Sequence, residues 1–114
     1  LQWDDHEVIN NWSPRLKGIK PRVARGRQAF LEHAPVRLDG NRIYRKIAYG
    51  PLLDVFVVDM RSYRAANNAN RQTREGGATR YLGREQIDWL LRDLRASRAV
   101  WKVIAADMPI GLKP

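Results

Sequence analysis

The sequence predicts an α/β fold built on a layered sheet. The expected elements follow one another in the order strand, hairpin, helix and strand. Two of the expected strands, 52–59 and 100–106, are nearly continuous apolar runs, which is typical of strands that are covered on both faces. Residues 83–97 carry apolar side chains at intervals of three and four, as an amphipathic helix does. Buried strands alternating with a helix favour layers of helix on sheet.

Residues 1–3 are expected to end a strand and to lead Asp4, Asp5 and His6 into a loop. In layered α/β proteins, ligands gather outside the carboxyl ends of the strands. The order of residues therefore places chemically active side chains where this fold class binds its ligands.

A helix is predicted from Pro21 to about His33. Proline is well tolerated at a first helical position, and the pair Ala34-Pro35 should end the helix. Gly26 weakens this helix, because glycine has low helix propensity.

Along residues 42–49 the side chains alternate in character between the two faces, as in a half-buried strand, and Gly50-Pro51 signals a turn. Together with 52–59 they should form an antiparallel hairpin whose second arm lies inside a larger sheet. The segment 65–80 is rich in Asn, Arg and Gly and is expected to be a long loop.

The helix 83–97 is the most regular in the chain, and Trp89 should flank its apolar face. That face is predicted to consist of Ile87, Leu90, Leu91 and Leu94. The strand 100–106 follows, and both Trp89 and Trp101 are expected in the core.

Composition limits the possible functions. With 114 residues the chain forms at most one small domain, and its lack of cysteine excludes disulfides and thiolate metal sites. A mean hydropathy of −0.55 without a long apolar run argues against a transmembrane helix. The chain opens on Leu1-Gln2-Trp3 without a methionine or the basic n-region of a signal peptide, and both of its ends are interpreted as cuts through a longer protein.

The net charge of +9 raises nucleic acid as a partner. Basic residues are densest between Arg15 and Arg27, a stretch without any acid. This stretch is either a face that attracts a phosphorylated substrate or nucleic acid, or an ordinary solvated surface whose acidic counterpart lies elsewhere.

The first twelve residues concentrate the groups that bind metals and move protons. Three acids and one histidine stand in a row, followed by two asparagines, with a tryptophan at either end. Carboxylate and amide oxygens suit hard cations, and imidazole ligates metals or transfers protons near neutral pH. A solvated acidic loop is the alternative.

The string Trp3-Asp4-Asp5-His6-Glu7-Val8-x-Asn10-Asn11-Trp12 resembles the alkaline phosphatase D (PhoD-like) metallophosphatases. The resemblance continues, in the family's order, through Arg42-Ile43-Tyr44-Arg45, Tyr49-Gly50, Val58 to Arg64, Leu82-Gly83, Gln86, Trp89-Leu90, Leu94, Ser97, Trp101 to Ile104 and Asp107-Met108-Pro109.

That resemblance implies a fold and an activity. The family fold is a layered α/β/β/α metallophosphatase sandwich, of which residues 1–114 would be the central part, truncated at both ends. The family hydrolyses phosphate monoesters and diesters with a metal cluster that includes iron and calcium in characterised members. Its implied mechanism is in-line attack of a metal-activated hydroxide on phosphorus. Members are typically exported, which implies a periplasmic or secreted parent protein.

The resemblance also implies residue roles. Asp5 is similar to the family's metal ligand, and His6 to the histidine that stabilises the phosphoryl group or protonates the leaving alkoxide; a hydrogen-bonded loop histidine is the alternative. Asp4 is the weaker candidate, either a second metal ligand or a group that orients the site. Glu7, Asn10 and Asn11 are expected to orient the loop through backbone hydrogen bonds, and Trp3 and Trp12 to pack around it.

Asp59 and Arg61 follow the buried strand, and a carboxylate–guanidinium pair between them would hold its end in place. Alternatively, Arg61 binds phosphate. The family's ligands from an earlier strand and a later segment are not in these residues, so the isolated chain should hydrolyse phosphate esters poorly. A basic nucleic-acid-binding module and a non-catalytic remnant remain as alternatives to the enzyme.

Overall fold

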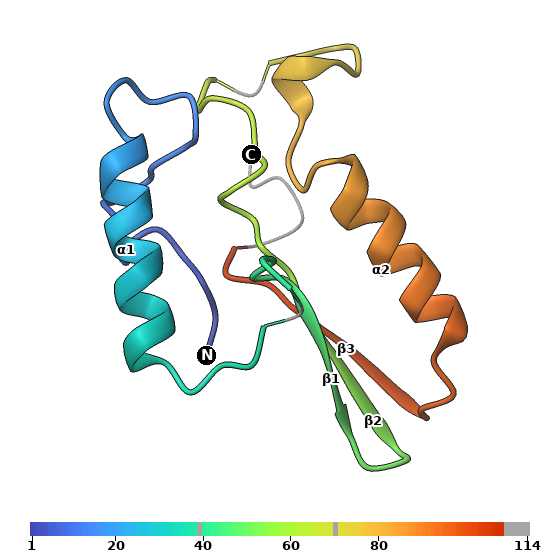
Figure 1. The fold of residues 1–114 in the computed structure, drawn as a ribbon. Helices are drawn as coiled ribbons and strands as arrows, with labels where there is room; N and C mark the ends of the chain where they lie inside the picture. The colour runs from blue at the N-terminus through green and yellow to red at the C-terminus, as the bar shows by residue number, and fades with distance from the viewer. Residues whose placement is uncertain (39, 70, 109–114) are drawn as a thin grey trace.

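The structure is a computed structural model that describes residues 1–38, 40–69 and 71–108. The described elements are α1 (Lys20–His33), β1 (Arg45–Tyr49), β2 (Leu53–Val57), the 3-10 turn η1 (Gly77–Thr79), α2 (Arg84–Ala96) and β3 (Trp101–Ala105). The chain is thus a mixed α/β structure, as predicted. One end of the molecule holds the N-terminal loop and α1, and the other holds the sheet and α2 (Figure 1).

The three strands lie in the order β1-β2-β3, so β2 is the central strand. β1 pairs antiparallel with β2, and Ile47 lies opposite Val55. β3 pairs parallel with β2, and Val103 lies opposite Val55. The predicted hairpin and the interior position of its second arm are confirmed. Since β2 and β3 are parallel, their carboxyl ends meet at the same edge of the sheet.

The second helix packs on the sheet through Trp89, whose side chain is 3% exposed. Its ring lies 4.9 Å from that of Tyr44 and 6.3 Å from that of Phe56, measured between centroids. The predicted apolar face was wrong in part, because Ile87 and Leu91 are exposed. The helix contacts the rings of Tyr44, just before β1, and Phe56, in β2, through Trp89, which leaves these two aliphatic side chains outside the contact.

The first helix buries Phe30 against Trp3 and Trp12 in a separate cluster that also contains Ile19 and Ile43. The predicted strand at residues 1–3 is wrong, because this segment has no regular structure. Side-chain hydrogen bonds hold this segment, where a strand would be held by backbone hydrogen bonds. Arg45 Nη2 donates to the carbonyl oxygen of Leu1 at 2.8 Å, and Gln2 Nε2 donates to that of Val58 at 2.5 Å.

β3 has no neighbouring strand on its outer side among the described residues. Trp101 is 69% exposed, so its predicted place in the core is wrong. An edge strand that lacks covering layers exposes side chains on both of its faces, which explains the exposed Val103 and Ile104 on the same strand. None of the described helices is long and apolar enough to cross a membrane.

Gln86, on α2, links the helix to the end of β2. Its side chain is 1% exposed. Its Oε1 accepts the backbone N–H of Asp59 at 2.7 Å, while its Nε2 donates to the carbonyl oxygens of Asp59 at 2.9 Å and Leu82 at 2.8 Å. These bonds satisfy the buried backbone of Asp59, which no strand ladder reaches.

We expect Gln86→Leu to lower the free energy of unfolding, because leucine fills a similar volume and leaves these backbone groups unpaired. The cost of each buried group left unsatisfied is about 1–3 kcal/mol. Gln28→Leu is the matched control, since Gln28 is exposed and its bond to Glu32 is at the surface. Urea denaturation measures both variants, and equal midpoints for the two would contradict the linking role of Gln86.

Candidate functional site

The acidic loop at the N-terminus is framed by its two tryptophans. Trp3 is 0% and Trp12 is 1% exposed, and their rings meet edge to face at 6.1 Å. Trp3 also meets the ring of Phe30 at 5.4 Å, which fixes the loop against α1. The prediction that the tryptophans pack around the loop is confirmed.

Hydrogen bonds within the loop hold Asp5 in place. Its carboxylate is buried, with 5% of the residue exposed, and Oδ2 accepts the backbone N–H of Asn11. Asn11 adopts a left-handed conformation, with φ of 54°, which asparagine tolerates better than most residues. The Glu7 carboxylate accepts the backbone N–H of Asp4 at 3.0 Å. Glu7 and Asn11 therefore orient the loop as predicted, the former through its side chain and the latter through its backbone.

His6 lies at the surface beside the buried Asp5. Its Nε2 is 3.3 Å from Oδ1 of Asn10, four residues later, and this contact is exposed. The loop thus places a held carboxylate and an accessible imidazole next to each other in the chain.

Gly26 lets α1 approach this loop closely. A Cβ atom at Gly26 would overlap the carbonyl oxygen of Glu7 and would lie 3.1 Å from both the carbonyl carbon of Glu7 and Cγ2 of Val8. A glycine that seems only to weaken the helix in the sequence therefore has a packing role, because no larger residue fits against the loop backbone.

Arg61 is the buried cation of the site, with 3% of the residue exposed. Its Nη2 lies 2.9 Å from Asp4 Oδ1 and 3.7 Å from Asp5 Oδ2, and its Nε lies 3.2 Å from Asp107 Oδ2. The structure thus brings the two predicted metal ligands, Asp4 and Asp5, together with the predicted phosphate-binding residue. Arg61 meets them as an ion-pair partner.

The predicted ion pair between the side chains of Asp59 and Arg61 is wrong. Oδ1 of Asp59 instead accepts the backbone N–H groups of Arg61 at 3.0 Å and Ser62 at 2.8 Å. Asp59 therefore shapes the turn after β2, while the guanidinium group of Arg61 extends away to the N-terminal loop. Burial raises the pKa of Asp59.

Asp107 is a site residue that the sequence interpretation missed. It stands two residues after β3, as Asp59 stands two residues after β2. Because the two strands are parallel, both acids emerge at the same edge of the sheet. This equal spacing is the sequence signal that could have identified it, once 100–106 was assigned as a strand next to 52–59.

The carboxyl groups of Asp4 and Asp107 shift each other's pKa in opposite directions. Burial, together with a hydrogen bond from the protonated Asp107 carboxyl to Asp4, raises the pKa of Asp107 to about 6. Burial opposes ionisation of Asp4, but hydrogen bonds from Asp107 and Arg61 outweigh it and lower the pKa of that carboxyl. Oδ1 of Asp107 and Nη1 of Arg61 are buried without a hydrogen-bond partner in the described part of the chain.

The carboxylates of this site are suitable ligands for a metal ion, but the described residues supply too few of them. Carboxylate oxygens suit hard cations, and the unpaired Oδ1 of Asp107 is one such donor. Among the described residues, however, no three acidic, histidine or cysteine groups are arranged to hold a metal ion. The guanidinium group of Arg61 already neutralises part of the negative charge there. A complete metal site therefore needs ligands besides these.

Comparison with known proteins gives consistent matches. A family model described as PhoD-like phosphatase matches residues 1–113. The chain is 35% identical over 128 aligned positions to the alkaline phosphatase D of Bacillus subtilis (strain 168). The alignment covers 95% of this chain and 22% of that protein. A solved structure described as "Structure of PhoD" matches with a TM-score of 0.71 and 35% identity, over 90% of this chain and 23% of the other. The chain thus spans less than a quarter of the length of either relative.

We expect Gly26→Ala to destabilise the fold, although alanine has the higher helix propensity. Propensity alone would stabilise by about 0.5–1 kcal/mol, whereas displacing the Glu7 backbone costs about 1–3 kcal/mol. Ala24→Gly, the reverse change at an exposed position of α1, is the control and should destabilise by about 1 kcal/mol. Thermal unfolding followed by circular dichroism measures both variants. A gain in stability from Gly26→Ala would show that the loop does not pack closely on this helix.

The raised pKa of Asp107 predicts a dependence of stability on pH. In the folded chain this carboxyl keeps its proton up to about 6, while in the unfolded chain it loses the proton near its ordinary value of 3.8. The unfolded state therefore binds fewer protons between these values, and stability falls as pH rises. Asp107→Asn cannot ionise and escapes this loss.

The stability of Asp107→Asn relative to the wild type should accordingly increase from a pH of about 4 to about 7. Urea midpoints across this range measure the difference. Asp88→Asn, at an exposed position of α2, controls for the loss of one negative charge. A difference between Asp107→Asn and wild type that stays constant with pH would show that Asp107 does not hold the proton.

Proposed function

Since the chain belongs to the PhoD-like phosphatase family, we propose that it supplies part of the active site of an enzyme that hydrolyses phosphate esters. The observation that supports this most directly is the loop Asp4–Asn11. It holds a buried carboxylate on Asp5 and presents His6 to solvent one residue later. A solvated acidic loop would need neither the buried carboxylate nor the tryptophan frame.

His6 is proposed to act on the phosphoryl group. In hydrolysis, water attacks phosphorus, the bond from phosphorus to the ester oxygen breaks, and the leaving alkoxide takes up a proton. An accessible imidazole can donate that proton or stabilise charge on the phosphoryl oxygens. The contact with Asn10 supports this role, because it restrains the ring without covering it.

Asp5 is proposed as a metal ligand, and Asp4 as a weaker second ligand. Asn11 and Arg61 both contact Asp5 through Oδ2, so neither of them uses its other oxygen. The further ligands would come from outside the described residues, and iron and calcium are the ions that the family resemblance implies. Such an ion supplies Lewis acidity at the phosphoryl oxygen.

For Arg61 we propose a positioning role rather than direct phosphate binding. Its side chain is 4% exposed, and two of its three nitrogens face carboxylates. A guanidinium group in this position fixes Asp4 and Asp5 relative to the sheet edge, which supports the geometry of the loop.

Finer properties remain proposals that rest on the family alone. They include activity on diesters as well as monoesters and export of the parent protein. Low activity of the isolated chain is expected because it spans 22% of its relative's length. Affinity for nucleic acid stays a prediction from the net charge of +9.

The experiment that tests the function is a segment exchange. Residues 1–113 replace the matching stretch of the Bacillus subtilis alkaline phosphatase D, and hydrolysis of p-nitrophenyl phosphate and of its diester is measured. We expect activity in the chimera and little in the isolated chain. His6→Ala in the chimera should lower kcat by about 10²-fold or more. Asp5→Asn should raise the metal concentration needed for half-maximal activity.

His33→Ala is the matched control, because His33 is the other histidine and lies exposed at the end of α1. Equal activities for His6→Ala and His33→Ala would contradict the proposed role of His6. Robust metal-supported turnover by the isolated chain, lost on His6→Ala, would show instead that the site is complete within it.

A further inference from the structure

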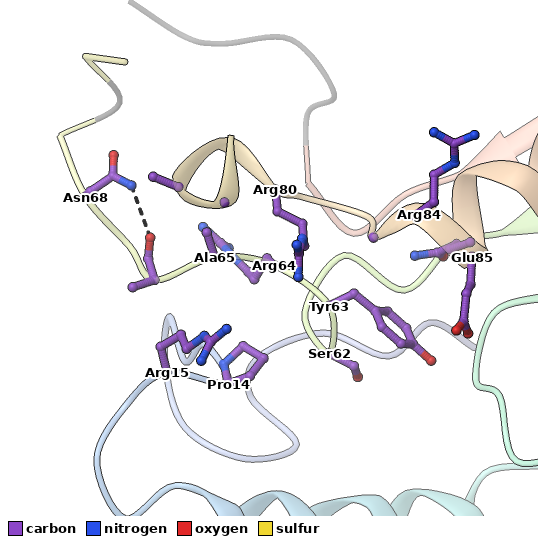
Figure 2. Close-up of a pocket in the computed structure, with 15 residues that line it drawn as sticks. Pro14, Arg15, Ser62, Tyr63, Arg64, Ala65, Asn68, Arg80, Arg84 and Glu85 are labelled. Atoms are coloured by element: carbon purple, nitrogen blue, oxygen red, sulfur yellow. Dashed lines mark hydrogen bonds between the residues drawn. The ribbon is translucent and has the colours of Figure 1, made fainter. Parts of the chain in front are cut away.

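A pocket of about 760 Å³ lies beside the acidic loop. One wall is Ser62 to Ala66, a second is the turn around Ala78 and Arg80, and a third is Pro14 with Arg15. Figure 2 shows Arg15 and Arg80 approaching this space from opposite sides. The volume falls within the range of small-molecule sites in proteins.

The pocket is strongly cationic. Arg15, Arg64, Arg80 and Arg84 line it, against the single acid Glu85. Arg84 is already occupied, because its Nε bonds both carboxylate oxygens of Asp88 at 2.9 and 3.0 Å, and it points away from the other arginines (Figure 2). Within the described parts of the chain, no ion pair is formed by Arg15, Arg64 or Arg80.

Arg64 is held in the pocket wall without a neutralising partner in the described ranges. Its guanidinium group lies 5.1 Å from the centre of the Tyr81 ring, and Nη1 is 3.8 Å from the Met108 sulfur. Its Nε is buried with no hydrogen-bond partner among the described residues. A buried donor on a charged group is costly to leave unpaired, so this position favours an anionic ligand.

The pocket adjoins the proposed active site. Ser62 begins its wall one residue after Arg61, which pairs with Asp4 and Asp5. The side chain of Asn67, on the continuing segment, donates to the carbonyl oxygen of Asn11 in the acidic loop. A ligand that spans both places would therefore meet the loop at one end and the arginines at the other.

We propose that this pocket binds a second anionic group of the substrate, so that the substrate is a phosphate ester with a further phosphate several bonds from the reacting one. The inference rests on the proposed function only for the identity of the molecule that carries the anion. Guanidinium groups recognise phosphate through paired charge-assisted hydrogen bonds. An ester with a single phosphate has no second group to place in this pocket while that phosphate lies at the acidic loop.

The first test measures binding of inorganic phosphate to the chain by calorimetry, without any need for hydrolysis. The double variant Arg15→Gln with Arg80→Gln should weaken binding by roughly tenfold or more. The control is Arg95→Gln with Arg98→Gln, which removes the same charge from exposed positions outside the pocket and should leave the affinity within about twofold.

Ala78→Glu adds a carboxylate to the exposed pocket wall and should abolish binding. Circular dichroism melting curves verify that each variant folds. Equal weakening by the two double variants, or the absence of phosphate binding to the folded wild-type chain, would overturn the proposal.

The second test uses the chimera and identifies the source of the anion. Bisphosphates of propanediol, butanediol and hexanediol are compared with propyl phosphate. The Arg15 and Arg80 double variant should raise KM for at least one bisphosphate and leave KM for propyl phosphate unchanged. Weaker product inhibition by phosphate, equal with all substrates, would instead identify a product site and overturn the proposal.

The two ideas can fail separately. A chimera without hydrolytic activity, combined with arginine-dependent phosphate binding by the chain, would remove the proposed function and keep the pocket. Hydrolysis by the chimera with no arginine-dependent phosphate binding would keep the proposed function and remove the pocket.

Discussion

The buried guanidinium group of Arg61 is the interaction on which the site depends. It connects three segments that are distant in the chain: the N-terminal loop through Asp4 and Asp5, the end of β2, and the end of β3 through Asp107. A buried cation must be paired, so these segments cannot separate without a large cost. Arg61 helps to lower the pKa of Asp4, while burial raises the pKa of Asp107. Three carboxylates surround one positive charge, and the most buried side chain among them, that of Asp107, keeps its proton up to a pH of about 6.

This arrangement separates the residues that hold the loop from His6, the residue proposed to react. Asp4 faces Arg61, Glu7 caps the backbone of Asp4, and Asn11 bonds Asp5. His6 is the loop's titratable side chain at the surface, touched by Asn10. A loop fixed by so many of its own polar groups has little conformational entropy left to lose on binding, which would favour the proposed catalysis by preorganisation.

Local patterns predicted most of the fold and part of the site. The hairpin and both helices follow from alternation, periodicity and the flanking Gly and Pro residues, all of which act within a few residues of one another. The orientation of α2 could not be predicted in this way, because it depends on Tyr44, just before β1, and on Phe56 in β2. The same limit applies to Arg61. Its nearest acid in the sequence is Asp59, yet its partners come from residues 57 and 46 positions away. Long-range pairing of charges is a property of the packed chain.

The distribution of arginines gives the net charge of +9 a physical meaning that composition alone does not. Arg61 is neutralised by carboxylates and serves the structure. Arg15, Arg64 and Arg80 line one pocket with no carboxylate paired to them in the described parts of the chain. In the proposed pocket an anion would neutralise them, and an anion with two groups would also reach the acidic loop. Charge near an anionic substrate raises its local concentration, but unpaired charge on opposite sides of one cavity also selects its shape. The second property distinguishes a binding pocket from a generally basic surface.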